Sequence, residues 1–233
     1  MTDVVSVGID LTNTNSQTLL VKLSWNPMLE EQKLIFPVWT PGSYTIRDHV
    51  KNLHSLKLYQ SSNEQSIDII RVSPSEWKFS VNCFENLTHE YAIEARTLSV
   101  RTSYLDNELA SLCFSAVIML VEEHRSSKHK LNVVLPEEWK LFIPLERANE
   151  DNTFLSTNYD DMIDAPLHAG NYSSSNFLVD GLTHQLLVFG HPPQGITDTF
   201  IEDIEGVCEA ACAILKSPPP SGDRYQLVIQ FLD

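Results

Sequence analysis

The chain has 233 residues, of which 42% are hydrophobic, and 16 basic residues against 31 acidic ones give a formal charge of −15. No run of about 18 apolar residues is present, which excludes an ordinary transmembrane helix, and the acidic surface disfavours binding to nucleic-acid phosphates. The first residues, MTDVVSVGID, lack the basic start and apolar stretch of a secretion signal, so we expect a cytoplasmic protein that binds neither nucleic acid nor membrane.

Most of the first 190 residues have the pattern of β-strands. Hydrophobic and polar residues alternate in residues 17–25, 76–81 and 89–97, with the period of two that is typical of a half-buried strand. Further candidate strands are residues 3–11, 33–39, 54–60, 66–72, 112–122, 130–135 and 182–190. Many short strands at this spacing predict a mainly β protein, with an antiparallel β-sandwich over residues 1–172.

Residues 36–53, FPVWTPGSYTIRDHVKNL, combine aromatic, turn-forming and charged residues. Pro41 fixes the second position of a tight turn, and Gly42 supplies the positive φ that a type II turn needs at the third. The turn would hold Trp39 on one side and Tyr44 on the other, with Arg47 close behind. Such a surface suits a specific ligand, and a structural corner with a packed tryptophan is the alternative.

Residues 173–233 are predicted to form a second, short α+β segment. Apolar residues recur at helical spacing over residues 199–216, where Thr199 and Glu202 are placed as a capping box. Three consecutive prolines end this helix, and a strand is predicted at residues 225–231. This order of helix and strand is expected for the first part of a larger domain. The apolar face of the helix could also support a dimer.

The sequence contains no complete active site. A zinc peptidase of the HExxH type needs two histidines one helical turn apart, but His89 and Glu90 are followed by Ile93 at the required position. Nucleophile-elbow, P-loop and Rossmann patterns are also absent. We therefore assign no catalytic residue, metal ligand or cofactor to this chain. Its four cysteines lack disulfide spacing and are expected to be reduced and buried.

Three blocks of sequence stand out: WTPGSYTIRD at residues 39–48, VRTSYLDNE at residues 100–108 and DAPLHAG at residues 164–170. In this order they resemble the N-terminal region of the glycyl aminopeptidase family of zinc metallopeptidases. The tail of the chain, with YQLVIQFLD, resembles the opening strand–helix–strand of that family's thermolysin-like (gluzincin) catalytic domain.

The resemblance implies an enzyme with a β-sandwich N-domain, a catalytic domain that holds Zn²⁺, and usually a PDZ-like domain. Its activity would be the removal of N-terminal residues, glycine preferred, from peptides. Residues 173–233 would begin the catalytic domain, and the sequence ends before the zinc motif would occur. The chain alone is therefore expected to be inactive and without zinc, and its partners in the full enzyme would be the peptide substrate and the catalytic domain.

In such an enzyme the sandwich would lie beside the substrate cleft. The candidate substrate-binding residues are Trp39, Tyr44 and Arg47 in the first block, and Tyr104 and Asp106 in the second. Asp106 could pair with the ammonium group of the peptide, and Arg47 with a backbone carbonyl or an acidic group. The alternative is that these charges only tie loops together.

A free-standing β-sandwich that binds a peptide or glycan through Trp39 and Tyr44, without enzymatic activity, is the alternative function. The two functions differ in the C-terminal part of the chain. A binding module would close its fold there, whereas the start of a larger domain would expose an apolar face on the helix predicted at residues 199–216.

Overall fold

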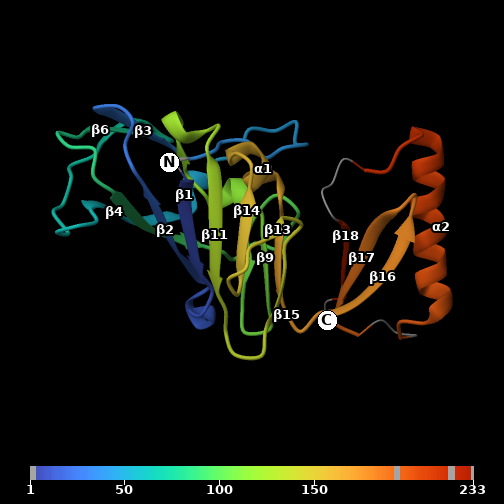
Figure 1. Ribbon diagram of the computed structural model, residues 1–233. Helices are drawn as coiled ribbons and strands as arrows, with labels where there is room; N and C mark the ends of the chain where they lie inside the picture. Colours follow the sequence, from blue (N-terminus) through green and yellow to red (C-terminus); the bar gives the residue numbers. More distant parts are fainter. Residues whose placement is uncertain (1–3, 192–194, 220–223, 232–233) are drawn as a thin grey trace. The chain divides into compact units, whose positions relative to one another are not determined.

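The computed structural model describes residues 4–191, 195–219 and 224–231 (Figure 1). The chain divides into two compact units, a first unit of Met1–Ala169 and a second unit of Gly170–Asp233. The described part is mainly β, as the sequence predicts, and none of its helices is long and apolar enough to cross a membrane.

A seven-stranded sheet, in the order β13-β14-β11-β1-β2-β7-β4, forms the largest layer of the first unit. Its strands are β1 (Val4–Asp10), β2 (Thr18–Trp25), β4 (Leu53–Gln60), β7 (Leu87–Glu94), β11 (Lys128–Val134), β13 (Glu146–Arg147) and β14 (Thr153–Ser156). All its pairs are antiparallel except β1 with β11, which run parallel from Val4 opposite Lys128 to Asp10 opposite Val134. Buried and exposed residues alternate along β1 and β2, so one face of this sheet points into the core.

Two four-stranded sheets and several short helical turns complete the first unit. One sheet has the order β10-β3-β6-β5 and the other β12-β15-β9-β8. Their strands are β3 (Glu31–Ile35), β5 (Ile70–Ser73), β6 (Glu76–Ser80), β8 (Tyr104–Leu105), β9 (Leu109–Leu112), β10 (Leu120–Val121), β12 (Lys140–Phe142) and β15 (Leu167–Gly170). The helical segments are α1 (Tyr159–Asp164) and the 3-10 turns Thr14–Ser16, His49–Asn52, Phe114–Ala116 and Glu122–His124.

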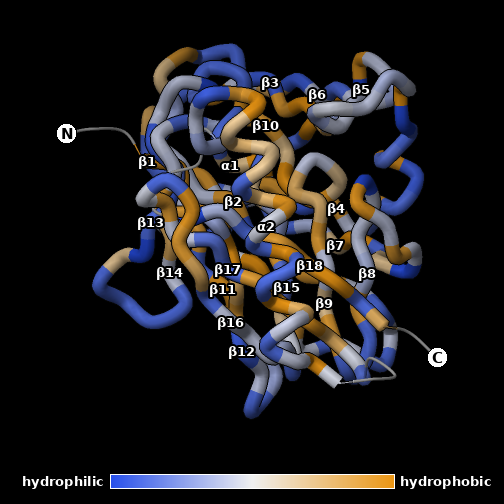
Figure 2. Tube along the Cα trace, turned by 90° about the vertical axis from the view of Figure 1, so that its right-hand side faces the viewer, coloured by the Kyte–Doolittle hydropathy of each residue, from blue (hydrophilic) through white to orange (hydrophobic). Residues whose placement is uncertain are grey.

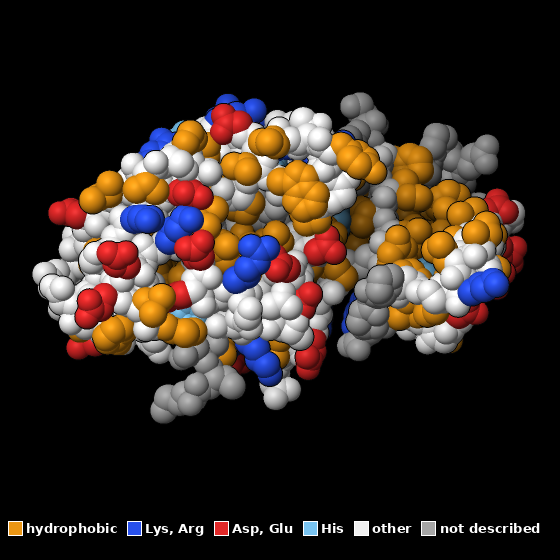
Figure 3. All heavy atoms as spheres, turned by 90° about the horizontal axis from the view of Figure 1, so that it is seen from above, with side chains coloured by type: hydrophobic (Ala, Val, Ile, Leu, Met, Phe, Trp, Pro, Cys, Tyr) orange, Lys and Arg blue, Asp and Glu red, His pale blue; other side chains and the backbone are white. Residues whose placement is uncertain are grey.

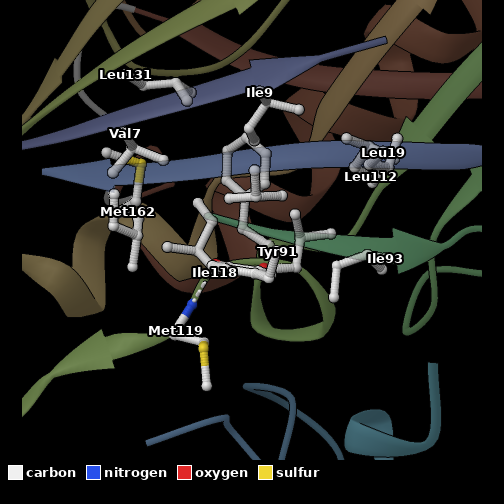
Figure 4. Close-up of a cluster of buried hydrophobic side chains, with 14 of the residues drawn as sticks. Val7, Ile9, Leu19, Tyr91, Ile93, Leu112, Ile118, Met119, Leu131 and Met162 are labelled. Carbon is white, nitrogen blue, oxygen red and sulfur yellow. Dashed lines mark hydrogen bonds between the residues drawn. The ribbon is translucent and has the colours of Figure 1, made fainter. Parts of the chain in front are cut away.

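One hydrophobic cluster receives side chains from all three of these sheets, as a β-sandwich requires. Figure 4 shows part of it, with Ile9 of β1, Leu19 of β2 and Tyr91 of β7 facing the segment that carries Ile118 and Met119. The Tyr91 hydroxyl accepts a hydrogen bond from the Met119 N–H at 3.0 Å and donates to the carbonyl of Val117 at 3.0 Å. The phenol thus satisfies backbone groups that are buried away from any strand partner.

The single strand predicted at residues 112–122 is wrong. The chain there ends β9 at Leu112, makes the 3-10 turn Phe114–Ala116 and forms only the two-residue strand β10. Most residues of this run are buried, and a continuous apolar sequence fits a buried strand and a buried coil equally well. Hydrophobic periodicity therefore cannot distinguish the two. Side chains replace the missing sheet partners, since Tyr91 bonds to Val117 and the Tyr159 hydroxyl donates to the Ile118 carbonyl at 2.7 Å.

The short helix α1 was not predicted, and neither were strands β12 to β16. The Asn158 side chain caps α1 by accepting the N–H of Asp161 at 2.8 Å. Arg125 holds the helix from outside through two hydrogen bonds to Asp160, at 2.8 and 3.1 Å. A helix of six residues has too few apolar positions to show a period in sequence.

The second unit is a three-stranded sheet, β16-β17-β18, covered by one helix. Its elements are β16 (Ser173–Val179), β17 (Leu182–Phe189), α2 (Asp198–Leu215) and β18 (Arg224–Gln230). Asp180 and Gly181, both with positive φ, connect β16 to β17 in a tight hairpin, and α2 then returns the chain to place β18 parallel to β17. The middle of β18 is a hydrophobic run in Figure 2.

The helix α2 matches the predicted helix except at its start. The predicted cap at Thr199 is wrong, because Thr197 accepts the N–H of Phe200 at 3.1 Å and the helix begins at Asp198. Both threonines have capping chemistry, and the chain uses the first. At the other end Lys216 adopts a positive φ of 56° and closes the helix.

Only part of the predicted apolar stripe of α2 is buried. Cys208 and Cys212 face the sheet and are 7% and 4% exposed. Val207, Ile214 and Leu215 point to solvent and are 67%, 80% and 73% exposed. The helix therefore presents a second, uncovered apolar face.

All four cysteines are free, as expected, but they are not all buried. Cys83 is exposed and Cys113 is only partly covered, which corrects the prediction for these two residues. Neither lies on the buried face of a helix or strand, so no periodic pattern could have placed them.

Candidate functional site

The 39–48 loop, which comprises residues 39–48, contains the predicted tight turn. The Ser43 N–H donates to the Thr40 carbonyl at 3.0 Å across this turn, and Gly42 has a φ of +75°. A positive φ at the third position is what a type II turn requires, and glycine adopts it without steric cost. The turn predicted from the sequence is confirmed.

Two aromatic side chains flank the turn, and both reach the surface. Trp39 is 47% exposed, and its indole N–H donates to the Ser43 carbonyl, which fixes the ring. Tyr44 is fully exposed and contacts no other described residue through a hydrogen bond. The loop lies at the top of the first unit in Figure 1, and hydrophobic side chains are exposed on that upper face in Figure 3. The loop therefore offers aromatic surface on a fixed backbone.

Buried polar side chains hold the loop from within the first unit. Thr40 Oγ1 lies 3.2 Å from His49 Nε2 and accepts a hydrogen bond from the Ser115 hydroxyl at 3.0 Å. All three residues are buried. Ser115 belongs to the 3-10 turn Phe114–Ala116, so this network joins two segments that are distant in sequence. A buried network whose members are satisfied specifies one arrangement of the loop.

The histidine of this network is uncharged at neutral pH. Burial lowers the pKa of His49, the charges of Arg47 and Lys51 lower it further, and Asp48 opposes them. A neutral ring that carries its proton on Nδ1 accepts the Thr40 hydroxyl proton at Nε2. The positive charge of the loop is therefore located on Arg47.

Arg47 has no hydrogen-bond acceptor for its side chain among the described residues. Its backbone N–H donates to the Val38 carbonyl at 2.6 Å, which fixes the main chain. The Nε atom is buried and unpaired, and no described carboxylate, Asp48 included, forms an ion pair with the guanidinium. The Nε–H is therefore an unsatisfied buried donor, and such a donor costs about 1–3 kcal/mol of stability.

The other two candidates lie on the hairpin of β8 and β9. The Tyr104 hydroxyl donates to Asp106 Oδ2 at 2.7 Å, and this bond raises the pKa of Tyr104. Asp106 Oδ1 accepts the backbone N–H groups of Glu108 at 2.8 Å and Leu109 at 2.9 Å. Both carboxylate oxygens thus hold the turn of the hairpin, which is the structural alternative considered for this residue.

The structure links the bases of the two elements but not their candidate side chains. The Ser103 hydroxyl donates to the Cys113 carbonyl at 3.4 Å, and Cys113 Sγ lies 3.2 Å from Ser115 Oγ in the network below the loop. Within the described residues no hydrogen bond or ion pair joins Arg47 to Asp106. The five candidates therefore form two separate groups, one on the loop and one on the hairpin.

The described residues do not fit a zinc ion. No three His, Cys, Asp or Glu side chains in the described ranges gather as possible metal ligands. Burial lowers the pKa of His89, His129 and His168 to about 4, so these rings are neutral core residues. Each lies against a polar neighbour, such as the Lys57 carbonyl at 2.9 Å from His89 Nδ1.

Sequence reasoning missed the polar network that positions the loop. Thr40, His49 and Ser115 were not among the candidates, because side-chain contacts across 75 residues leave no local pattern. One signal was present in the sequence. Ser115 is a lone polar residue inside an apolar run, and such a residue needs a hydrogen-bond partner when the run is buried.

The family model of the peptidase M61 N-terminal domain matches residues 6–171. None of the curated proteins matches the chain. The matched range contains both groups of candidate residues and the whole network below the 39–48 loop.

Three solved structures share the fold. An aminopeptidase N family protein from Idiomarina loihiensis superposes with a TM-score of 0.87 at 24% identity, over 98% of this chain and 39% of that protein. An M1 zinc metallopeptidase from Deinococcus radiodurans superposes with a TM-score of 0.51 at 10% identity, over 98% of this chain and 57% of that protein. Aminopeptidase A from Legionella pneumophila superposes with a TM-score of 0.55 at 12% identity, over 98% of this chain and 28% of that protein. The chain thus spans about a quarter to somewhat over half of these relatives.

Proposed function

Because this chain belongs to the peptidase M61 N-terminal domain family, we propose that it is the non-catalytic N-terminal portion of a zinc-dependent, glycyl aminopeptidase-like metallopeptidase. In the whole enzyme it would help to shape the cleft in which N-terminal residues, glycine preferred, are removed from peptides. A PDZ-like domain and a cytoplasmic location belong to the same proposal.

The observation that carries this proposal is the family match over residues 6–171. The Idiomarina loihiensis protein is more than twice as long as the part that this chain covers, which leaves room for a catalytic domain in a protein of this kind. Zinc would be held by residues outside this sequence, and we assign none of its ligands to this chain.

The second unit supports the proposal through the surface that it leaves uncovered. Val207, Ile214 and Leu215 form an exposed apolar face on α2, as expected for the start of a larger domain. The strand β18 is paired within the described residues only with β17, and parallel strands are normally found inside sheets. We propose that the remainder of a thermolysin-like catalytic domain covers this helix face and extends this sheet.

The two groups of candidate residues have different parts in the proposed cleft. Trp39 and Tyr44 would contact apolar parts of the peptide, and Arg47 would bind a carbonyl or acidic group. Asp106, oriented by Tyr104, would attract the ammonium group of the peptide with the charge that its three hydrogen bonds leave in place.

The test compares the 233-residue chain with a polypeptide that continues into the zinc domain. We expect the longer protein, loaded with zinc, to release glycine from glycyl-p-nitroanilide and from glycyl peptides, and to lose this activity with a chelator. The 233-residue chain should be inactive in the same assay. A longer protein that binds zinc and cleaves no N-terminal residue would contradict the proposal.

The full exposure of Tyr44 favours one second candidate, a binding module for peptides or glycans. Such a module would bind its ligand tightly without any continuation of the chain. Micromolar binding of a glycan or peptide by the 233-residue chain, together with an inactive longer protein, would favour this function.

A further inference from the structure

Arg47 combines a covered stem with an open charged end. Of its three guanidinium nitrogens only Nε is both buried and unpaired, and no described residue accepts a hydrogen bond from the Nη nitrogens. The two Nη groups are therefore at the surface. They form the planar fork of N–H donors that binds a carboxylate through two parallel hydrogen bonds.

The loop fixes the backbone that carries this fork before any ligand arrives, and the buried Nε restricts the end of the side chain. The backbone of Arg47 is bonded to Val38, and the loop is anchored through Thr40 to His49 and Ser115. A side chain on an anchored backbone loses less conformational entropy when it binds than one on a mobile loop, which raises its affinity for a matching acceptor.

The charges around Arg47 select a ligand with a single negative charge. The chain carries −15 overall and so repels polyanions such as nucleic acid, whose binding needs several basic groups. Within residues 47–51 the balance is positive, since Arg47 and Lys51 outnumber the single acid Asp48, and all three charges act on the His49 ring. One free guanidinium matches one carboxylate. The exposed rings of Trp39 and Tyr44 suit the uncharged remainder of a peptide.

We propose that Arg47 is a specificity-determining residue that binds one carboxylate group of a peptide through its two Nη nitrogens. The carboxylate is either the C-terminal group of a short peptide or an acidic side chain. The assignment to a peptide substrate rests on the proposed function, whereas the assignment to a carboxylate rests on the loop itself.

The first test uses the 233-residue chain and follows the Nε–H signal of Arg47 by nitrogen NMR, because a buried N–H exchanges slowly with water. The probes are N-acetylglycine, N-acetylglutamic acid α-amide and the uncharged N-acetylglycinamide. We expect a saturable shift with a carboxylate probe, and binding of the amide that is about tenfold weaker or absent. Saturation by one acid alone identifies the terminal or the side-chain carboxylate as the ligand. Equal shifts with acid and amide, or none with either acid, would overturn the proposal.

Variants separate the guanidinium fork from its charge. Arg47→Gln should abolish the response to the carboxylates, and Arg47→Lys should weaken it because an ammonium group lacks the planar fork. For these variants the response is read from the backbone amides of the loop. Arg101→Gln removes an exposed arginine whose side chain forms no hydrogen bond or ion pair with a described residue, and this matched control should bind like the original chain. Unchanged binding in a folded Arg47→Gln protein would exclude Arg47 as the receptor.

The second test uses the longer, zinc-loaded enzyme. Arg47→Gln should raise KM for glycyl peptides that carry the bound carboxylate and leave KM for their amidated counterparts unchanged, with kcat little affected. An equal effect on both substrates would refute the inference while the proposed function stands. Carboxylate binding at Arg47 in a longer protein without peptidase activity would instead refute the proposed function and leave the site in place.

Discussion

Ser115 donates its hydroxyl proton to Thr40 Oγ1 at 3.0 Å, across 75 positions of the chain. Both residues are buried, and Thr40 is also in hydrogen-bonding contact with His49. The conformation of the 39–48 loop is therefore fixed by a segment that follows β9. Substitutions far from the loop in sequence should therefore change how well ordered the loop conformation is.

Removal of the Ser115 hydroxyl should destabilise the first unit and loosen the loop. Ser115→Ala leaves the buried Thr40 oxygen with one partner fewer, which should cost about 1–2 kcal/mol in the free energy of unfolding. Urea unfolding measures the loss, and hydrogen exchange of the backbone amides of residues 42–48 reports the loop. The matched control is Ser126→Ala at an exposed position, which should change stability by less than about 0.5 kcal/mol. Equal stability of both variants would contradict the role of the network.

The first unit should lose stability as the pH falls from 6.5 towards 4. His89, His129 and His168 have pKa values of about 4 in the folded state, against about 6.5 when unfolded, so the unfolded chain binds more protons in this range. Three such groups give a slope of at most about 4 kcal/mol per pH unit. Urea midpoints between pH 7 and pH 5 measure this slope. Replacing His89 by Gln should remove about one third of the contribution of these three histidines, and an unchanged slope would show that His89 does not contribute.

Tyr44 should matter for substrate but not for stability. Its side chain is fully exposed and unbonded, so Tyr44→Ala should change the free energy of unfolding by less than about 0.5 kcal/mol. In the longer enzyme the same change should raise KM for peptides roughly fivefold, which corresponds to about 1 kcal/mol of binding. Val100→Ala, at another exposed apolar position, is the control. Unchanged kinetics with unchanged stability would remove Tyr44 from the proposed cleft.

The exposed face of α2 should cause the 233-residue chain to self-associate. Ile214 is 80% and Val207 67% exposed, and burial of such surface between two copies is favourable. Ile214→Glu should shift the chain towards monomers in sedimentation velocity experiments. Glu202→Gln, which removes a charge from the exposed polar side of the same helix, should leave association unchanged or increase it. Monomers at all concentrations in the original chain would contradict the predicted dimer.

Gly190 should tolerate substitution less well than Gly181 of the same unit. It has a φ of +81°, and a Cβ there would overlap the backbone oxygen of Phe231. Gly190→Ala should therefore cost more than about 2 kcal/mol and expose the amides of β17 and β18 to hydrogen exchange. Gly181 has a φ of +79° with open space around it, so Gly181→Ala should cost only about 1 kcal/mol. Similar losses in the two variants would show that backbone strain alone is responsible.

The sequence predicted those elements whose residues alternate or recur regularly. β2 and β6 have one buried face and one exposed face, and α2 buries one side, so each shows its period. Residues 112–122 have no such contrast, because most of them are buried on every side, and the predicted strand there is wrong. The serines at the start of β16 give no sign of a strand in the sequence, since serine at exposed strand positions carries no hydrophobic signal.

For the candidate site, the sequence identified the turn but not what holds it. Pro41 and Gly42 have backbone preferences that act locally, so their conformation can be predicted without knowledge of tertiary contacts. The burial of Arg47 Nε depends on how distant segments pack, and no spacing encodes it. The same holds for Asp106, whose hydrogen bonds to its own turn became visible only in the structure.

The strand β1 lies in the middle of the seven-stranded sheet, although it is the first strand that the structure describes, because it pairs with β2 on one side and with β11 on the other. During synthesis β1 can join β2 at once, but its other edge must wait until about residue 134 has left the ribosome. Until then an apolar, half-paired strand is open to the wrong neighbours. Molecules whose translation starts after β1 would lack the strand that joins the two halves of the sheet, β13-β14-β11 and β2-β7-β4. Such shortened products should be insoluble.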